Sequence, residues 1–514
     1  MKRLIICVML AGAAILAAAC EAGSPLAPDE VPATAISSTL PVPQPTDTPL
    51  PTAGQSPRPQ PDAAGCTRVV APDGDDSAAG TANAPWRTFQ HAADMAAPGD
   101  VICFRGGVYA GEETFIAVSG QETQPILFVA YPGEQPILDG QGQVGGILTL
   151  QPGASYLGID GFVMTGYTVW GVSLEGDNHT ITLRHLDVGG GEAGIHFTVG
   201  ESGQDPWYGP VEHITVEDSV IHNVTYTAVD CTPGPCNDMR FSGLEIYGAG
   251  LSGGSSFAAD GLAVERGQPI RVEDCVIHDN GGDGIDLNSR DWDGGVTDVV
   301  VWRNQVYRNH LQAIKLWAGG RMENNVVWGQ GINPVTVGVY PGEYVVAHNT
   351  IAYNLWDPAF SARDYSFVAA YPEVGESAPI RLQLVNNIFA YNGSAEVGGP
   401  TGIYLGAGVT LVDSGGNLFF SREDGEIQAD FVTERDPWFT QADIAGGAWA
   451  AVSGSLGDFV ADPLFVAGWP EVDLHLRSGS PAIDAALADF APSGDLEGNP
   501  RVEPPDVGAY EFRP

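Results

Sequence analysis

A short β-rich motif recurs along this chain from residue 185 onward. Hydrophobic runs next to Asn, Asp or Gly appear in segments such as RHLDVGG, EDSVIHN, EDCVIHD, HNTIAYN and NNIFAYN. Successive copies lie 20 to 38 residues apart, and one short strand per step of this length is typical of a solenoid. The second residue of each copy falls at His185, Asp218, Gly243, Asp274, Asn304, Asn324, Asn349, Asn387 and Asn417.

The type of solenoid follows from what these copies contain. They are β-rich rather than helical, they lack the leucine-rich pattern, and they place Asn or Asp at one recurring turn. Asparagines at equivalent turns can hydrogen-bond from coil to coil, so this column needs no ligand to explain it. His222 and His278 also recur at one repeat position and are expected to stack between coils. The sequence therefore predicts an all-β fold, a right-handed parallel β-helix.

One helix is expected before the coils begin. The stretch APWRTFQHAADMAAPGD carries apolar residues at helical spacing, Trp86, Phe89 and Ala93, and ends at a Pro-Gly pair. This pattern predicts an amphipathic helix that plugs the open end of the stack. Solenoids need such a cap because the edge of an open first coil would pair with other chains.

The N-terminus predicts export. Residues 1–20, MKRLIICVMLAGAAILAAAC, combine basic residues, an apolar run and small residues before Cys20, as in a lipoprotein-type signal peptide. Residues 21–65 hold eleven prolines and no aromatic residue, so they are expected to form a disordered tether. We expect an extracellular cell-surface lipoprotein acylated at Cys20, or a secreted protein. The predicted β-helix domain covers residues 66–514, with the cap and first coils in 66–150 and a C-terminal segment in 455–514.

The charge of the chain excludes some partners. It has 64 acidic against 22 basic residues and a formal net charge of −42, which repels nucleic acid and anionic membranes alike. An anionic substrate would need cations to bridge it to this surface. We expect a monomer that touches a membrane only through its lipid anchor.

Five cysteines follow the signal segment, in a compartment that favours disulfides. Cys231 and Cys236 can close a short loop. Cys66 can tie the start of the domain to its first strand at Cys103, which would leave Cys275 free and buried. The sequence alone does not fix these pairings.

Two columns of polar residues emerge when five segments that follow a turn are aligned: EAGIHF, TAVD, DGLAVE, DGIDLN and QAIKLW. Equivalent residues of successive coils stack about 4.8 Å apart, so the alignment shows which side chains are neighbours. The first column reads Ala193, Thr227, Asp260, Asp283 and Gln312, and the second reads His196, Asp230, Ala263, Asp286 and Lys315.

The two columns predict a cluster of carboxylates. They bring Asp260, Asp283 and Asp286 within a few ångströms of one another, and Asp230 is a candidate fourth member. Such a cluster is unfavourable unless a cation neutralises it, and oxygen ligands of this charge suit Ca²⁺. Lys315 lies one coil beyond and is the only lysine after the signal segment. Because arginine cannot deprotonate, a lysine kept in a chain of twenty arginines is informative.

The segments FAADGLAVE, NGGDGIDL and AIKLWAGG, in this order, resemble the calcium-dependent pectate lyases of polysaccharide lyase family nine. The resemblance implies β-elimination on an acidic, pectate-like uronan with Ca²⁺ as cofactor. Matched residue by residue, it implies that Asp260, Asp283 and Asp286 hold the calcium. Lys315 would be the catalytic base that removes the C5 proton. Gly282 stands where the family usually shows a second Asp, so one ligand is missing.

The ends of the domain carry the same resemblance more loosely. The opening PWRTFQHAADMAAPGDVICFRGGVYAG resembles the start of these extracellular β-helix proteins, and the tail DPLFVAGWPEVDLHLRSGSPAIDA resembles a C-terminal segment of bacterial surface β-helices with varied activities. Arg290 and Arg321 lie close in sequence to the carboxylate cluster. Either can clamp a substrate carboxylate or be a solvated turn residue.

Two other functions remain open from the sequence. A β-helical glycoside hydrolase could use Asp283 and Asp286 as acid and base, and its activity would survive chelation and give saturated products. The tether and the tail also permit a non-catalytic adhesin or glycan-binding solenoid. Each aspartate by itself is more often structural, because Asp-Gly pairs are common at turns for conformational reasons.

Overall fold

The computed structural model describes residues 65–198, 209–251, 259–287, 298–354, 367–369, 380–392, 402–406, 408–421, 427–429 and 438–514. The predicted signal peptide, Cys20 and nearly all of the predicted tether lie outside these residues. Residues 59–514 belong to one compact unit. Within the described ranges, no helix is both long and apolar enough to cross a membrane.

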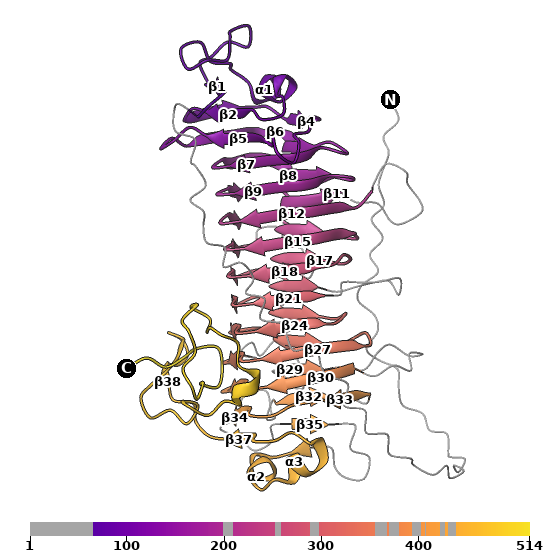
Figure 1. The fold of residues 1–514 in the computed structure, drawn as a ribbon, viewed down its shortest axis with the longest axis vertical. Helices are drawn as coiled ribbons and strands as arrows, with labels where there is room; N and C mark the ends of the chain where they lie inside the picture. The colour runs from indigo at the N-terminus through magenta and orange to yellow at the C-terminus, as the bar shows by residue number, and fades with distance from the viewer. Residues whose placement is uncertain are drawn as a thin grey trace, which may run out of the picture. The chain divides into compact units, whose positions relative to one another are not determined.

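The unit is a parallel β-helix, as the repeats predict (Figure 1). Each coil adds one strand to each of three faces, and strands of successive coils pair in parallel and in register. The first face is a 13-stranded sheet in the order β1 (Arg68–Val70), β2 (Val101–Phe104), β5 (Ile126–Ala130), β7 (Ser155–Asp160), β9 (His179–Arg184), β12 (Val211–Glu217), β15 (Cys236–Ser242), β18 (Ile270–Glu273), β21 (Val299–Trp302), β24 (Gly320–Glu323), β27 (Gly342–Ala347), β30 (Ile380–Val385) and β33 (Val409–Leu411).

The second face follows the first along each coil. Its strands are β3 (Gly107–Ala110), the first part of β6 (Pro136–Leu150), the first part of β8 (Val163–Glu175), β10 (Asp187–Gly189), β13 (Val220–His222), β16 (Glu245–Tyr247), β19 (Val276–His278), β22 (Gln305–Tyr307), β25 (Val326–Trp328), β28 (Thr350–Ala352), β31 (Ile388–Ala390), β34 (Leu418–Phe420) and β37 (Phe459–Val460). The long strands β6 and β8 continue onto the third face.

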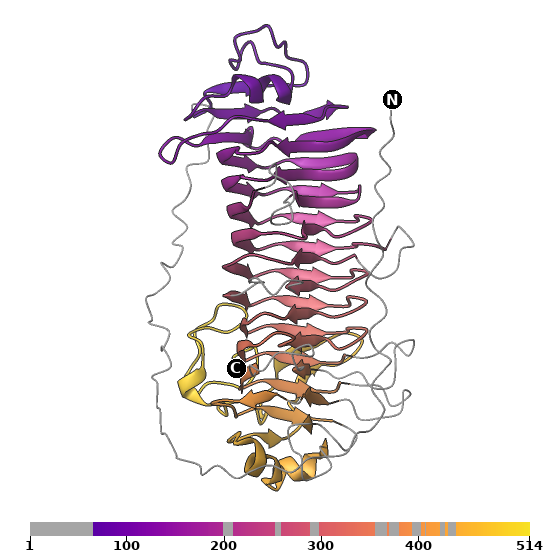
Figure 2. The same cartoon turned by 90° about the vertical axis from the view of Figure 1, so that its right-hand side faces the viewer.

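The third face carries the candidate site. Beyond the ends of β6 and β8 it consists of β4 (Thr114–Ile116), β11 (Ala193–Thr198), β14 (Val229–Cys231), β17 (Leu262–Val264), β20 (Ile285–Leu287), β23 (Ile314–Leu316), β26 (Val335–Val337), β29 (Phe367–Ala369), β32 (Ile403–Leu405) and β35 (Ile427–Ala429), with β36 (Trp438–Phe439) added antiparallel. Figure 2 shows the coils stacked one above another along the axis.

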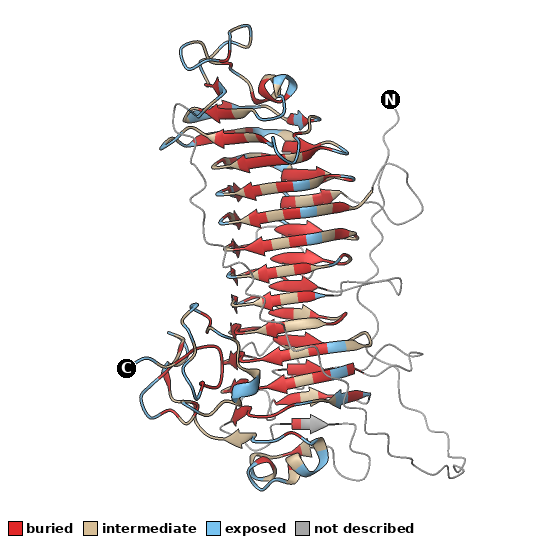
Figure 3. Ribbon diagram, viewed as in Figure 1, coloured by how far each residue is buried: buried red, intermediate tan, exposed pale blue. Residues whose placement is uncertain are grey.

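The core lies inside the coils because side chains alternate between inside and outside along each strand. In β20, Ile285 and Leu287 are fully buried and point inward, so Asp286 between them is on the outer side. Figure 3 shows the buried positions repeating from coil to coil. The strands therefore fix which residues of the third face can meet a ligand.

The predicted cap is present as α1 (Phe89–Met95), at the N-terminal end of the coils (Figure 1). Thr88 caps it by accepting a hydrogen bond from the backbone N–H of His91, and Phe89 packs against Phe104 at a ring distance of 4.4 Å. At the other end lie α2 (Gln441–Ala445) and α3 (Ala448–Ser453). Both ends of the apolar core are thus covered.

The predicted asparagine column exists, but its register was wrong in part. In this column, each side-chain amide donates a hydrogen bond of 2.9 to 3.0 Å to the Oδ1 of the asparagine on the next coil, in the order Asn304, Asn325, Asn349, Asn387 and Asn417. The amide of Asn417 donates in turn to Asp458 Oδ1 at 2.9 Å. The prediction had placed Asn324 in this column, together with His185, Asp218, Gly243 and Asp274. These five occupy the preceding position, where φ is 48 to 64°, and Asn, Asp and Gly are favoured there because they tolerate left-handed backbone.

We expect Asn349→Ala to destabilise the domain by about 3 kcal/mol or more, since each buried group left unsatisfied costs about 1–3 kcal/mol. The Asn349 amide donates to Asn387 Oδ1 and to the carbonyl of Met322, and its Oδ1 accepts from the backbone and side chain of Asn325. Thermal unfolding followed by circular dichroism measures this. An unchanged midpoint would mean that the ladder adds nothing to stability.

The predicted C-terminal segment packs on the outer side of the second face, beside the last coils (Figure 1). It contains the hairpin β38 (Phe465–Ala467) and β39 (Asp473–Leu476) and the short 3₁₀ helix Ala488–Phe490. Asn324 binds this segment by donating to the carbonyl of Gly494 at 2.8 Å and accepting from Arg501 at 2.8 Å. Asn324 therefore has a docking role that its place in the repeat did not reveal.

Cysteine pairing follows one of the arrangements open from the sequence. Disulfides join Cys66 to Cys103 and Cys231 to Cys236, and Cys275 is free and buried. The two histidines expected to stack between coils do so. The continuous ring stack on the second face consists of His222, Tyr247, His278, Tyr307 and Trp328, with centroids 4.6 to 5.3 Å apart.

Candidate functional site

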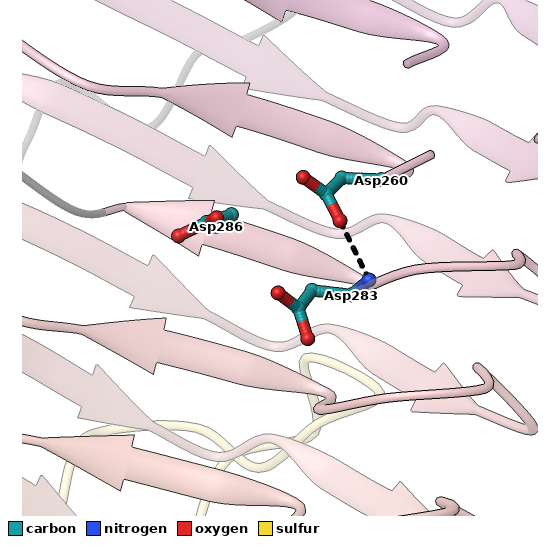
Figure 4. Close-up of side chains that lie close together, drawn as sticks. All are labelled: Asp260, Asp283 and Asp286. Carbon is teal, nitrogen blue, oxygen red and sulfur yellow. Dashed lines mark hydrogen bonds between the residues drawn. The ribbon is translucent and has the colours of Figure 1, made fainter. Parts of the chain in front are cut away.

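Three aspartates meet on the third face, as the aligned columns predict. Asp260 precedes β17, Asp283 precedes β20, and Asp286 is the central residue of β20. One carboxylate oxygen of each lies within 4.8 Å of the others. Asp260 Oδ1 accepts a hydrogen bond from the backbone N–H of Asp283 at 2.7 Å (Figure 4). This bond joins the two coils at the point where the carboxylates converge.

Lys315 completes the cluster from the next coil. It pairs in register with Asp286, as β23 pairs with β20. Its Nζ lies 2.5 Å from Asp283 Oδ2 and 3.2 Å from Asp286 Oδ2, and its side chain is only 16% exposed. The ring of Trp317, two residues on, has its centroid 5.3 Å from Nζ. The amine is therefore held between two carboxylates and an indole on the outer wall of the β-helix.

Burial and like charge disturb the ionisation of this cluster. Burial raises the pKa of Asp260 well above its ordinary value, and the charges of Asp283 and Asp286 raise it further. Burial also raises the pKa of Asp283, although Lys315 opposes this. Burial alone would lower the pKa of Lys315, but the three carboxylates outweigh burial and raise it. Without another cation, Lys315 is thus a firmly held ammonium group.

The missing ligand at Gly282 has a steric explanation. A Cβ added at Gly282 would lie 2.4 Å from Asp260 Oδ1 and 2.9 Å from the backbone of Ala259, so no side chain fits there.

The side chain of Gln312 offers another oxygen to a metal ion at this site. The backbone N–H of Gln312 donates to Asp283 Oδ1 at 2.7 Å, while its side-chain Oε1 is buried and accepts no hydrogen bond within the described residues. Gln312 stood in the predicted column, yet its amide oxygen was not assigned a role.

Asp230 does not join the three aspartates. It pairs in register with Ala263, which pairs with Asp286, so the methyl group of Ala263 separates the two carboxylates along the column. Asp230 Oδ2 instead lies 3.3 Å from His196 Nδ1, and Oδ1 accepts from the hydroxyl of Thr232 at 2.6 Å. The predicted second column is therefore correct in register, but the metal role predicted for Asp230 has no support from its contacts.

Neither of the two arginines predicted to bind substrate is found beside the aspartates in the described part of the chain. Arg321 lies on β24 of the first face, where its guanidinium pairs with Glu323 at 2.6 Å. The structure does not bring it to the aspartates, since the chain leaves the third face between Lys315 and Arg321. Arg290 lies outside the described residues.

Trp317 also belongs to the site, although the two aligned columns do not include it. It lies two residues after Lys315, and residues two apart on a strand share a face. That spacing was the signal available in the sequence. Its indole nitrogen is buried and forms no hydrogen bond within the described part of the chain.

Comparison with known proteins supports the fold. Residues 68–308 match the family described as the Pel9A-like right-handed β-helix region, so the predicted fold and the predicted resemblance are confirmed. The pectate lyase PEL9 of Emericella nidulans is 44% identical over 73 residues, which are 14% of this chain and 18% of that protein. The chain thus matches about a fifth of that relative's length. The uncharacterised protein YwoF of Bacillus subtilis is 23% identical over 340 residues, 55% of this chain and 71% of YwoF.

Solved structures of similar fold have varied activities. Pectate lyase Pel9A is 18% identical, with a TM-score of 0.47 over 87% of this chain and 97% of Pel9A. XylC in complex with xylose is 12% identical, with a TM-score of 0.49 over 87% of this chain and 98% of XylC. The A-module of the mannuronan C-5 epimerase AlgE4 of Azotobacter vinelandii is 14% identical, with a TM-score of 0.41 over 66% of this chain and 88% of the module.

Proposed function

We propose that this Pel9A-like β-helix protein is a calcium-dependent polysaccharide lyase that cleaves an acidic, pectate-like uronan by β-elimination. The observation that carries the proposal is the meeting of Asp260, Asp283 and Asp286 with Lys315 on one outer wall of the β-helix. Three ionised carboxylates, two of them buried, with a single ammonium keep an excess of negative charge. A divalent cation would remove that excess.

The residues present fit a calcium ion. Asp260, Asp283 and Asp286 offer carboxylate oxygens within 4.8 Å of one another, and the buried Oε1 of Gln312 offers a neutral oxygen. Calcium takes 6 to 8 oxygen ligands, including carboxylates and amide carbonyls. Gln312 would then supply an oxygen ligand in place of the missing Asp at position 282. Substrate carboxylates and water would fill the remaining positions.

The chemistry divides between the cation and this chain's residues. Ca²⁺, when bound, would neutralise the aspartates and draw electrons from the uronate carboxylate, which makes the adjacent C5 proton more acidic. Lys315 accepts that proton at Nζ as the neutral amine. The C5–H electrons form the C4–C5 double bond while the bond from C4 to the glycosidic oxygen breaks. The electron pair of that bond leaves with the oxygen, which takes up a proton from water and becomes the hydroxyl of the released sugar. The ammonium formed on Lys315 is stabilised by Asp283 and Asp286, which face it in the structure.

The test is to incubate the purified protein with polygalacturonate and Ca²⁺ and to follow the ultraviolet absorbance of unsaturated products. We expect product formation that stops with EDTA and returns when calcium is added. Alginate and glycosaminoglycans should be assayed in parallel to define the uronan. If none of these gives unsaturated product with calcium, the lyase proposal is wrong.

Two outcomes would favour the other functions. Saturated products that persist in EDTA would indicate a hydrolase using Asp283 and Asp286. Binding of a uronan without any turnover would indicate a glycan-binding surface protein.

We further propose that the protein works outside the cell, attached through an acylated Cys20. The support is the sequence of residues 1–20 and the proline-rich stretch that follows it. Metabolic labelling with a palmitate analogue in a host that processes lipoproteins tests this, with Cys20→Ala as the control. Equal labelling of the two forms would contradict acylation at Cys20.

A further inference from the structure

We propose that the third face holds a second, distal binding site for the same acidic polysaccharide, centred on His196. This inference rests on the proposed function. The column of Lys315 and Asp286 continues toward the N-terminus through Ala263, Asp230 and His196, each pair in register. A polysaccharide lying along this wall would pass over all of these positions.

His196 is held in place from two sides. Its Nδ1 lies 3.3 Å from Asp230 Oδ2, and the ring of Trp170 stacks on it with centroids 5.9 Å apart and planes 16° apart. Asp230 is itself fixed by the hydroxyl of Thr232, and the indole nitrogen of Trp170 donates to Thr149 at 3.3 Å. The imidazole is therefore oriented before any ligand arrives. Its Nε2 forms no hydrogen bond within the described residues, and the side chain is 25% exposed.

The chemistry at this position suits a sugar rather than a metal ion. One carboxylate, one imidazole and one indole meet here, together with the hydroxyls of Ser173 and Thr198, which lie 3.3 Å apart. Ser173 pairs in register with His196 but is fully buried, so it is the half-buried Thr198 that a ligand can reach. Oriented polar groups next to an aromatic ring are the usual means of fixing a polar ligand. Because Nδ1 faces Asp230 Oδ2, Nε2 of the neutral imidazole would accept a hydrogen bond from a hydroxyl of the sugar.

The distance between the aspartate cluster and His196 determines how long an oligomer must be to contact both. Three coil steps separate Asp286 from His196, which is about 14 Å at about 4.8 Å per step. A short oligomer bound at the aspartates cannot reach that far, whereas a longer one can. His196 is thus a positioning residue that strengthens the binding of long chains and takes no part in bond cleavage.

The chain offers a matched control for this histidine. His222 on the second face also bonds to an aspartate of a neighbouring coil, with Nε2 2.9 Å from Asp187 Oδ1, and also stacks on an aromatic ring, that of Tyr247. It therefore shares the packing of His196 without sharing its face. A purely structural role for such a histidine would affect both variants alike.

The experiment compares the variants His196→Ala, His196→Gln and His222→Ala with the parent. For each protein, the affinity, kcat and KM are determined for uronan oligomers of increasing length. Affinity is measured by calorimetry with Ca²⁺ in a Lys315→Arg background, so that nothing is cleaved, and kcat and KM are measured in the active protein. We expect His196→Ala to raise Kd and KM by up to about tenfold for long oligomers, as the loss of one hydrogen bond does. Short oligomers and kcat should be unchanged, His196→Gln should recover part of the loss, and His222→Ala should match the parent.

A second variant reaches the same site without altering His196. A Cβ added at Gly146 would lie 2.1 Å from the indole nitrogen of Trp170, so Gly146→Ala should displace that ring and weaken long oligomers as well. If both variants bind every length as the parent does, or lose affinity equally for all lengths, the distal site is wrong while the lyase proposal stands. If the parent neither binds nor cleaves any oligomer, both proposals fail.

Discussion

Lys315→Arg is expected to lower turnover of a uronan by about 10²- to 10⁴-fold, the usual contribution of a general base, without unfolding the protein. Arginine keeps the positive charge and can still pair with Asp283 and Asp286, which lie 2.5 and 3.2 Å from Nζ in the parent. It cannot give up its proton near neutral pH, so it cannot take one from C5. Initial rates of unsaturated product formation at saturating calcium measure the change.

The opposite substitution, arginine to lysine at a position away from the site, provides the control. Arg308 pairs with Asp279 through Nε at 2.8 Å at a turn after the second face, so Arg308→Lys exchanges the same two residue types away from the candidate site. We expect its turnover to equal that of the parent. Circular dichroism and the thermal midpoint establish that Lys315→Arg is folded. A folded Lys315→Arg protein with normal turnover would remove Lys315 from the reaction.

The location of the candidate site could be predicted because the β-helix turns a sequence alignment into a spatial one. Aligning DGLAVE, DGIDLN and QAIKLW required no insertion, and the observed pairs Ala263 with Asp286 and Asp286 with Lys315 are those of the alignment. Strand register transmits this information because side chains alternate strictly along a strand. The same argument placed His196 and Asp230 correctly in their column.

What the alignment could not supply was the contact that each side chain makes. Asp230 was a plausible metal ligand by position, but its carboxylate binds His196 and Thr232. Arg321 is six residues from Lys315 in sequence, but the chain turns onto another face in between. Asn324 and Asn325 are identical neighbours, and only the backbone decides which one has the left-handed φ and which one joins the ladder. Spacing in sequence does not encode these choices.

Asp260→Asn is expected to have opposite effects on the calcium-free and the calcium-bound protein. In the calcium-free state, Lys315 lies against Asp283 and Asp286, and Asp260 is a third carboxylate, whose ionised form is disfavoured because its surroundings raise its pKa. Asparagine keeps the Oδ1 that accepts from the backbone N–H of Asp283 at 2.7 Å, and it removes the repulsion. We therefore expect the thermal midpoint measured in EDTA to rise, because like charges brought together out of water oppose folding.

The same substitution should weaken calcium binding, because it removes one charged ligand from the cluster. We expect the Kd for Ca²⁺ to rise at least tenfold, about 1.4 kcal/mol of binding free energy. A ligand at a hundredfold excess over Kd stabilises a protein by about 2.7 kcal/mol, so the rise in midpoint on adding calcium should shrink in parallel. Calorimetric titration and thermal unfolding with and without calcium measure both effects.

The control is Asp187→Asn, which removes a carboxylate paired with His222 on the second face. It should change neither the affinity for calcium nor the rise in midpoint on adding calcium. A variant that binds calcium as tightly as the parent would show that Asp260 is no ligand, and the cluster would then have to be explained as a structural feature of stacked Asp-Gly turns.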